Sequence, residues 1–421
     1  MSRTFSSLAF PSYRRYFTGV TASNIGMWMT RTAQSWVVLV ELTAGDAQAL
    51  GWLTAIMFVP TLALTPVAGS VSDRFPKRTV MLVAQLFLLV DIVTLSVLSL
   101  SGALRLWHVF ALATMDGVAS AFDAPCRQAI VSEMVPPDKV SNAIGLNSTS
   151  FNAARLLGPG AAGILIAAIG SGWVFVVNAV TYLVHICCLL RLQPSQMTAT
   201  RAPDRRSGSL LVAVRYVAKR PDLALLLTIA AGMGAFGFNF SITNPLMSTE
   251  VFGKGAGEFG ALGSVMGIGS LTAALLAARR RRPRLRHVAV ALGLFAGLLA
   301  VSAMSPSFWF FTLLMVPLGW TSVQVMVTAN ALIQVAVAPE FRGRVMALWT
   351  AMILGLTPVV SPVLGVVGAY WGARATVWAC AGGMIALFVG VSLYLAHSPG
   401  VEVHMTRRRP WVSVEPRSTG R

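Results

Sequence analysis

Long apolar runs, separated by short polar or basic stretches, constrain this chain more than any other feature of its sequence. A helix needs roughly 17 to 25 apolar residues to cross a hydrocarbon layer, and the runs at 50–71, 80–100, 174–190 and 375–395 meet this requirement. Charged residues make up only 11% of the chain, against about a quarter in soluble proteins. Most of the chain is therefore expected to lie in lipid.

Pro, Gly and charge clusters divide the chain into twelve candidate spans: 16–41, 50–72, 79–101, 106–124, 140–168, 173–191, 223–246, 258–278, 287–304, 308–336, 345–368 and 374–396.

Each span is expected to be an α-helix, because lipid leaves no partner for unpaired backbone polar groups. The runs also lack the two-residue alternation of a membrane barrel strand. The sequence thus predicts an all-α membrane protein with twelve transmembrane helices.

The positions of the basic residues orient these spans. With both ends placed inside the cell, only Arg105, Lys254 and Arg374 of the 33 Lys and Arg fall outside, while Arg31 and Arg155 lie within spans. Basic loops are retained on the cytoplasmic side, so both termini are expected to be cytoplasmic in a bacterial inner (plasma) membrane. The net charge of +18 follows from this bias, so it does not indicate nucleic-acid binding.

The longest polar interruption, 192–222, divides the spans six and six. The expected organisation is a cytoplasmic segment 1–15 without a signal peptide, a six-helix bundle 16–191, a cytoplasmic linker 192–222, a second bundle 223–396 and a cytoplasmic tail 397–421. Apolar residues between 210 and 217 have helical spacing, which fits either a short helix on the membrane surface or the start of the next span. The halves also repeat at an offset of 202 residues, as in Gly163 and Gly365, which predicts two pseudo-symmetric bundles with a site between them.

The loop between the second and third spans carries an ordered set of small and charged residues: Gly69, Asp73, Arg74, Lys77 and Arg78. It resembles the loop motif of the major facilitator superfamily, with Pro76 in place of the second Gly. Gly69 permits close helix approach, and Asp73 can face the positive amino end of a helix in the other half, so these residues are expected to latch an inner gate. Asp123 is expected to receive Arg74 or Lys77. The alternative is that both acids only balance nearby arginines.

Further stretches at 121–136, 142–147, 154–163 and 339–344 are similar to the major facilitator branch that includes the enterobactin exporter and macrolide efflux proteins. This resemblance covers nearly the whole chain, and it implies efflux from the bacterial cytoplasm, usually against proton entry. Within it, Gly158, Pro159 and Gly163 resemble the antiporter motif of exporters, with Ala162 replacing one Gly. Small residues allow close helix packing, and Pro159 removes a backbone donor, so the helix can bend.

Ionisable residues inside a membrane are functional candidates by default, and here they are Arg31, Asp91, Asp116 and Arg155. In the superfamily that the chain resembles, the first and fourth helices line the central cavity, which favours Arg31 and Asp116 over Asp91 on an outer helix. Asp116 is the expected proton carrier, with Arg31 or Arg155 as its partner. The alternative is a permanent ion pair that holds helices together. The Arg that proton antiporters often carry in the fourth helix is missing near Ala113, which weakens the case for proton coupling.

Neutral polar residues are expected to line a substrate cavity: Gln34, Asn239, Gln324 and Asn330. Such a cavity, with Trp28 and other aromatic and Met residues nearby, suits a bulky, largely apolar compound. The four cysteines lack metal-site spacing, so no metal or cofactor is expected. The basic run from Arg279 to Arg286 can contact anionic lipids, and the protein is expected to act as a monomer.

The sequence therefore predicts a secondary active transporter that exports a small amphiphilic drug, antibiotic or siderophore by alternating access, with protons moving inward. An importer or uniporter remains open. A membrane-embedded enzyme is disfavoured, because the chain has no nucleophile motif, no metal ligands and no acid and His constellation.

Overall fold

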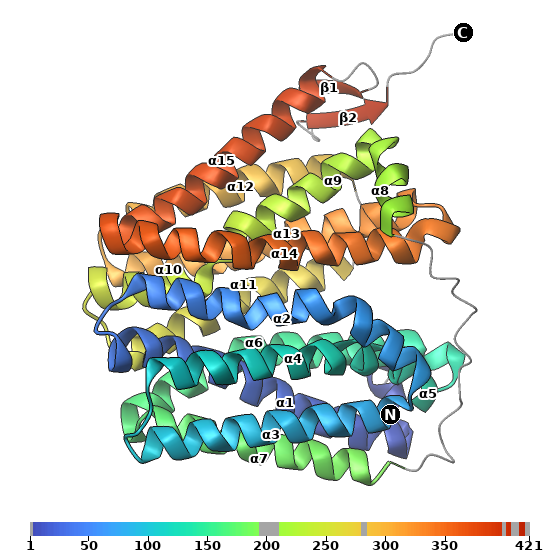
Figure 1. The fold of residues 1–421 in the computed structure, drawn as a ribbon. Coiled ribbons are helices and arrows are strands. Elements are labelled where there is room, and N and C mark those ends of the chain that lie inside the picture. The colour runs from blue at the N-terminus through green and yellow to red at the C-terminus, as the bar shows by residue number, and fades with distance from the viewer. Residues whose placement is uncertain (1–2, 193–209, 279–283, 398–400, 406–411, 417–421) are drawn as a thin grey trace.

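The computed structural model describes residues 3–192, 210–278, 284–397, 401–405 and 412–416 (Figure 1). A short 3-10 helix, η1, leads into the amino-terminal bundle. The elements of this bundle are η1 (Arg3–Ala9), α1 (Pro11–Trp36) with its π-helical extension η2 (Val37–Leu42), α2 (Ala47–Arg74), α3 (Lys77–Leu100), α4 (Leu106–Ala129), α5 (Val131–Met134), η3 (Pro137–Lys139), α6 (Val140–Ile169) and α7 (Ser171–Leu190).

The carboxyl-terminal bundle repeats the same number of long helical passes. Its elements are α8 (Leu210–Ala218), a broken pass made of α9 (Pro221–Gly232), η5 (Met233–Gly237), α10 (Phe240–Leu246) and η6 (Met247–Val251), then α11 (Ala256–Ala278), α12 (Leu285–Ala303), α13 (Phe308–Ala336), α14 (Pro339–Trp371) and α15 (Ala373–His397). The chain then forms an antiparallel hairpin of β1 (Val401–Met405) and β2 (Val412–Pro416), in which Val401 pairs with Pro416. The hairpin was not expected, but the membrane part is all-α as predicted.

Ten helical segments of the described chain are long and apolar enough to cross a membrane. The two predicted spans that fall short are those of α1 and α4. These helices carry polar side chains into the interior of the bundle, including Asn24, Gln34 and Asp123, all of which are buried. They pack against apolar neighbours, since α1 contacts α6 and α7, and α4 contacts α2 and α3.

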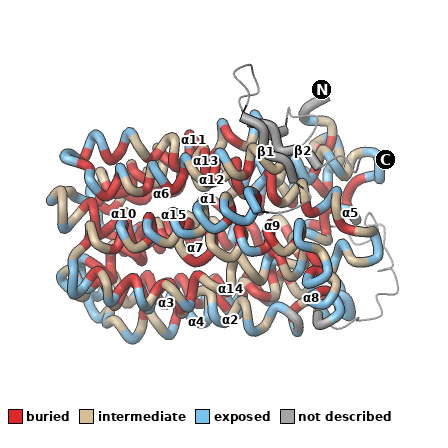
Figure 2. Tube along the Cα trace, turned by 90° about the horizontal axis from the view of Figure 1, so that it is seen from above, coloured by how far each residue is buried: buried red, intermediate tan, exposed pale blue. Residues whose placement is uncertain are grey.

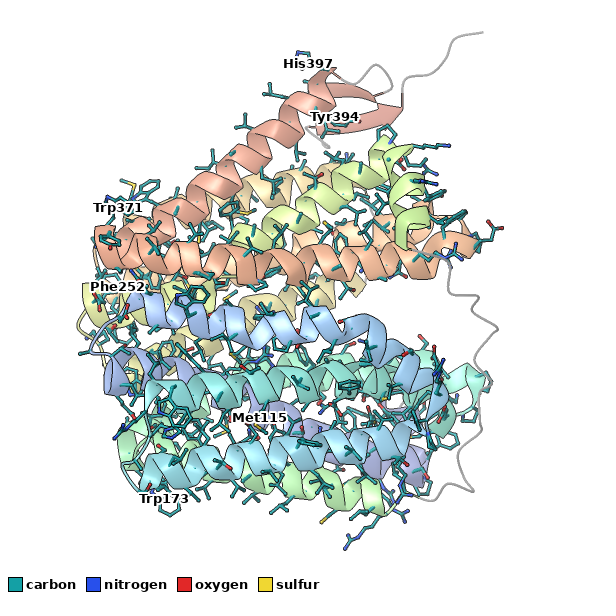
Figure 3. The ribbon with its side chains drawn as sticks, viewed as in Figure 1. Met115, Trp173, Phe252, Trp371, Tyr394 and His397 are labelled. Atoms are coloured by element: carbon teal, nitrogen blue, oxygen red, sulfur yellow. The ribbon has the colours of Figure 1, made fainter. Side chains whose placement is uncertain are left out.

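We call the end of the molecule that carries α5 and α8 the linker face, and the opposite end the far face (Figure 1). Exposed aromatic residues gather at the far face, where helices begin or end. They include Trp52, Trp107, Trp173, Trp309, Tyr370 and Trp371, and Figure 3 shows the labelled Trp173 and Trp371 at this end. Aromatic rings concentrate where lipid tails meet the polar headgroups, so this ring of aromatic residues marks one membrane boundary. Between the faces, buried residues lie on the sides of helices that meet their neighbours (Figure 2).

The predicted span 223–246 is not one continuous helix. Its helical hydrogen bonding changes to π-type at Met233–Gly237, and the chain leaves the helix at Phe238 and Asn239. Three glycines, Gly232, Gly234 and Gly237, fall in this stretch, and glycine lowers the cost of leaving helical geometry. The freed carbonyl oxygen of Gly234 accepts a 2.8 Å hydrogen bond from Thr357 Oγ1 on α14.

The expected internal repeat is present in the backbone. Gly170 joins α6 to α7 and Gly372 joins α14 to α15, both with positive φ, at 94° and 83°. A Cβ at Gly163 would meet the Ala256 carbonyl oxygen of α11, and one at Gly365 would meet the Ala47 carbonyl oxygen of α2. Equivalent glycines therefore bring equivalent helices together, as two pseudo-symmetric bundles require.

The bundles meet near the far face. Figure 1 shows α2 and α14 side by side there and diverging toward the linker face. Two hydrogen bonds cross between the bundles in the far half: Thr54 Oγ1 with Ser241 Oγ at 3.5 Å, and Gly160 N donating to Ser264 Oγ at 2.9 Å. Near the linker face, a Cβ at Gly69 would have no neighbour within 4 Å among the described residues. The bundles thus pack together at the far face and separate toward the linker face, an arrangement that we call open at the linker face.

The linker helix α8 is a separate element, because it ends at Ala218 and α9 begins at Pro221. It docks on the start of α14, where the Tyr216 ring stacks on Phe341 with centroids 4.3 Å apart. The rest of the predicted linker, 193–209, and most of the basic run from Arg279 lie outside the described residues.

Candidate transport site and gating residues

Two arginines and three aromatic rings meet where α1, α2 and α6 of the amino-terminal bundle lie together. The guanidinium carbons of Arg31 and Arg155 lie 5.4 and 5.6 Å from the ring centre of Trp28. Arg31 also lies 5.8 Å from Phe58, and the Trp28 and Phe151 rings meet edge to face. Cation–π contacts of this length are attractive, most strongly when desolvated. The sequence predicted both arginines, and the structure joins them through Trp28.

Asp116 lies under the electrostatic influence of Arg31. No ion pair within 4 Å involves Asp116, Arg31 or Arg155 in the described part of the chain. The charge that acts on Arg155 is that of Arg31, so Arg31 is the arginine placed to influence Asp116. Figure 3 labels Met115, the neighbour of Asp116, midway between the two faces. The permanent ion pair that the sequence left open is therefore absent at Asp116 among the described residues.

Asp91, which the sequence placed on an outer helix, faces inward. It is buried on α3, and one of its carboxylate oxygens has no hydrogen-bond partner among the described residues. Asp91 and Asp116 repel each other electrostatically. Asp91 is thus buried although α3 is an outer helix, because one side of that helix packs against α4 and α7.

Asp123 has a different partner from the one expected. Its Oδ2 accepts a 2.6 Å hydrogen bond from Arg127 Nε, one turn further along α4. The same guanidinium donates to Asn24 Oδ1 at 3.1 Å and to Ser23 Oγ at 3.3 Å on α1. The predicted contact of Asp123 with Arg74 or Lys77 is therefore wrong for this structure. A residue four positions away on a helix is the nearer partner.

Two basic residues of the loop 69–78, Lys77 and Arg78, are bound within their own bundle. Lys77 Nζ lies 2.5 Å from Glu133 Oε1 on the short helix α5. Arg78 donates to the carbonyl oxygens of Leu189 and Leu190, at 2.8 and 2.9 Å, and so caps the end of α7. Asp73 and Arg74 are exposed. The latch residues thus stand at the open linker face, with Asp73 turned to solvent.

The motif in α6 lies in the contact between the bundles. Gly158 packs on α1, where a Cβ would come within 2.6 Å of Trp28 Cβ. A Cβ at Gly263 of α11 would meet the Pro159 ring at 2.6 Å, and Gly163 faces Ala256 and Gly260. The hydrogen bond from Gly160 N to Ser264 Oγ follows Pro159 directly. The three predicted residues therefore join α6 to α1 and α11.

The four predicted cavity residues differ in their hydrogen bonds and in their exposure. Asn239 is buried, donates to Ala235 O at 2.7 Å and accepts from Ser361 Oγ at 3.3 Å. Gln324 is buried and donates to Ala273 O at 3.3 Å. Asn330 accepts from Gln334 at 2.6 Å, and Gln34 is 3% exposed. Asn239 and Gln324 therefore contribute to helix packing.

Sequence reasoning missed Arg127, Glu133, Tyr182 and His185. Arg127 could have been found from its i,i+4 spacing to Asp123. His185 is fully buried on α7, and Tyr182 lies in the fields of Asp91, Asp116 and Arg127. No pattern in the sequence reveals these relationships, because they join helices that are distant in the chain.

Comparison with known proteins identifies the family. A family described as transmembrane secretion effector matches residues 2–415. The chain belongs to this family of the major facilitator superfamily. Its members are membrane transporters rather than enzymes, as the sequence predicted.

Curated relatives are transporters of several kinds. The chain is 25% identical over 256 residues to the staphyloferrin A transporter of Staphylococcus aureus, covering 60% of this chain and 63% of that protein. It is 25% identical over 232 residues to the multidrug efflux pump Tap of Mycolicibacterium fortuitum, covering 52% and 55%. It is 28% identical over 218 residues to the tetracenomycin C resistance and export protein of Streptomyces glaucescens, covering 48% and 39%. The chain thus aligns with less than two thirds of each relative.

Solved structures share the fold. A bacterial homologue of the human lysosomal transporter Spinster, solved in an inward-facing and unoccupied conformation, has a TM-score of 0.69 at 17% identity, covering 92% of this chain and 96% of the other. A POT family transporter in complex with a thioalcohol conjugated peptide has a TM-score of 0.73 at 11% identity, covering 91% and 96%. The chain is therefore a multi-pass membrane transporter with the major facilitator fold.

Proposed function

We propose that this protein exports a small amphiphilic compound, such as a drug, antibiotic or siderophore, from the bacterial cytoplasm across the inner membrane in exchange for protons. The observation that carries the proposal is that Asp116 lies within the electrostatic influence of Arg31 but forms no ion pair in the described part of the chain. A carboxyl group near a cation that is not bound to it can bind a proton in one conformation and release it in another.

The shape of the structure supports alternating access. With the linker face toward the cytoplasm, as the basic loops favour, the structure has its inner side open and its outer side closed. The domains 16–191 and 223–396 would rock about the glycine contacts near the far face. Closure of the inner side would bring Asp73 from solvent to the other bundle, where it could meet the positive amino end of α14.

The direction of transport is supported by the relatives. Multidrug efflux, macrolide efflux and tetracenomycin C export appear in the names of three of them. The Trp28, Phe58 and Phe151 rings beside Arg31 and Arg155 suit a ligand with an apolar body and polar groups. The neutral residues Gln34, Gln324 and Asn330 would complete the site, and the protein would act as a monomer, with anionic lipids at Arg279–Arg286.

A transport assay in everted membrane vesicles tests the proposal. Vesicles that contain the protein should accumulate at least one compound from a panel of ethidium, erythromycin and a desferri-siderophore when a proton gradient is imposed, and collapse of the gradient should abolish accumulation. Accumulation only in right-side-out vesicles would instead establish an importer. Equilibration that ignores the gradient would establish a uniporter.

A further inference from the structure

The amino-terminal bundle encloses several polar atoms that have no hydrogen-bond partner in the described part of the chain. They are both amide atoms of Gln85, Oδ1 of Asp91, Oδ1 of Asp123 and both ring nitrogens of His185. Gln85 and His185 are 0% exposed, and Asp91 is 4% exposed. A buried polar atom left without a partner costs about 1–3 kcal/mol, so such groups in native proteins bind internal water or have a functional role.

These side chains form a series in depth. At 1.5 Å per residue, His185 lies about 7 Å from the linker-face end of α7, and Asp123 lies about 9 Å from that of α4. By the same helical rise, Gln85 lies about 12 Å along α3, and Asp91 and Asp116 both lie about 20 Å from the linker-face ends of their helices. The series therefore runs from near the linker face to the depth of the predicted proton carrier.

The helices that carry the series pack together, since α3 contacts both α4 and α7, and α7 contacts α1. His185 lies beside α1, with its ring 6.5 Å from that of Tyr16. A Cβ at Gly19 would come within 2.9 Å of the His185 ring. Tyr182, one turn nearer the far face on α7, lies in the fields of both Asp91 and Asp116. These side chains thus lie on helices that pack against one another within the amino-terminal bundle.

We infer that protons leave Asp116 through the interior of the amino-terminal bundle: Asp116 shares a proton with Asp91, and from Asp91 the proton passes through water held by Gln85 to His185 and the linker face. This inference rests on the proposed proton coupling and adds the route and the second carboxyl group. The proton route would then be separate from the substrate, which would occupy the space between the bundles.

Each step moves one proton and changes no oxidation state. The Asp116 carboxyl group gives its proton to the Asp91 carboxylate, and Asp91 then gives a proton to water. The Gln85 amide carries no proton itself, but it can accept one water hydrogen bond and donate another. A water proton passes to a ring nitrogen of neutral His185, which releases its proton toward the linker face. Two ionised carboxylates at one depth repel each other, so one proton shared between them is the stable arrangement.

The groups that interact electrostatically with Asp91 are Asp116 on α4 and Tyr182 on α7. The same helices and α1 carry further charged and titratable groups: Asp123 and Arg127 on α4, His185 on α7, and Arg31 and Tyr16 on α1. Helix α2 carries charges only at its linker-face end, Asp73 and Arg74. Arg31 is the cation that acts on Asp116.

Infrared difference spectroscopy of the purified protein in nanodiscs tests the inference without any substrate. A pH titration should give a protonated-carboxyl band that both Asp91→Asn and Asp116→Asn change, because each removes one member of a coupled pair. Asp91→Glu should restore the band at a shifted frequency. If Asp91→Asn leaves the Asp116 band unaltered, the shared proton is disproved.

A pH-jump experiment on the same samples tests the route. His185→Phe and Gln85→Leu should slow growth of the carboxyl band by about tenfold, which corresponds to a barrier raised by about 1.4 kcal/mol. Thr376→Val is the matched control, because it removes a fully buried hydroxyl without a partner from the other bundle; its rate should match that of the wild type. Unchanged rates in both route variants would overturn the route.

The vesicle assay tests the proposed antiport separately from the route. If transport by the wild-type protein does not depend on the proton gradient, antiport is refuted, whatever the spectra show.

Discussion

Gly163 of α6 and Gly260 of α11 pack so closely that neither position has room for a Cβ. A Cβ at Gly163 would lie 2.9 Å from Gly260 Cα and 2.6 Å from the Ala256 carbonyl oxygen. Both obstacles are backbone, which cannot turn away as a side chain can. This contact and its pseudo-symmetric counterpart between Gly365 and Gly51 hold the far face closed.

Gly163→Val should therefore separate the bundles at the far face. We expect the closed state to lose about 1–3 kcal/mol, as for other overpacked contacts, and transport to fall because the far face no longer seals. A cysteine at Ser264, which faces Gly160 across the contact, should become reactive toward a water-soluble maleimide. Gly257→Val on α11 is the control, since a Cβ there meets nothing within 4 Å among the described residues. Equal labelling in the two variants would show that this contact does not seal the face.

Arg127→Met should destabilise the fold. It would leave the buried Asp123 carboxylate without its 2.6 Å partner and remove the contacts to Ser23 and Asn24. Breaking a buried pair costs about 3–5 kcal/mol, which a thermal melt in detergent should show as a clear drop in the melting temperature. Lys139→Met removes the exposed pair with Asp138 and should change stability by less than about 1 kcal/mol. The double variant Asp123→Asn with Arg127→Met should recover part of the loss; no recovery would mean that the pair itself does not matter.

Asp73→Asn should reduce transport without reducing the stability of the open state. Asp73 is exposed here, so its charge does not hold this conformation together; its contact forms only when the linker face closes. Transport in vesicles should decrease while the melting temperature stays at the wild-type value. Glu133→Gln is the contrasting variant, because Glu133 already binds Lys77 and its loss should lower stability. A lower melting temperature for Asp73→Asn would contradict the latch.

Asp116→Asn should uncouple transport from protons. The amide keeps the shape of the side chain but cannot take up a proton at this position. Expression and downhill equilibration of the transported compound should persist, while accumulation against its gradient should be lost. Arg155→Met should spare the proton dependence, since the charge that acts on Asp116 is that of Arg31, and should instead weaken substrate binding. Full accumulation by Asp116→Asn would exclude it as the proton carrier.

The fold was predictable because membrane helices are specified locally. Run length, charge bias and glycine repeats are all properties of neighbouring residues, and lipid permits few alternatives to helices. The broken pass around Gly234 was missed because its π-helical bonding depends on the hydroxyl of Thr357, which arrives from α14. The bounds of the helices also differ from the predicted spans: α1 begins at Pro11, whereas the first predicted span begins at residue 16.

By itself, the sequence determined the twelve helices, the two repeated halves and the small set of charges placed among apolar residues. Only the tertiary structure decided which of those charges meet. Arg31 and Arg155 converge on Trp28, Asp123 takes Arg127, and Asp91 is buried on α3 under the electrostatic influence of Asp116. The physical reason is that a residue's membrane depth follows from its position along one helix, whereas its partners depend on how each helix is rotated against the others. That rotation is set by packing over the whole bundle.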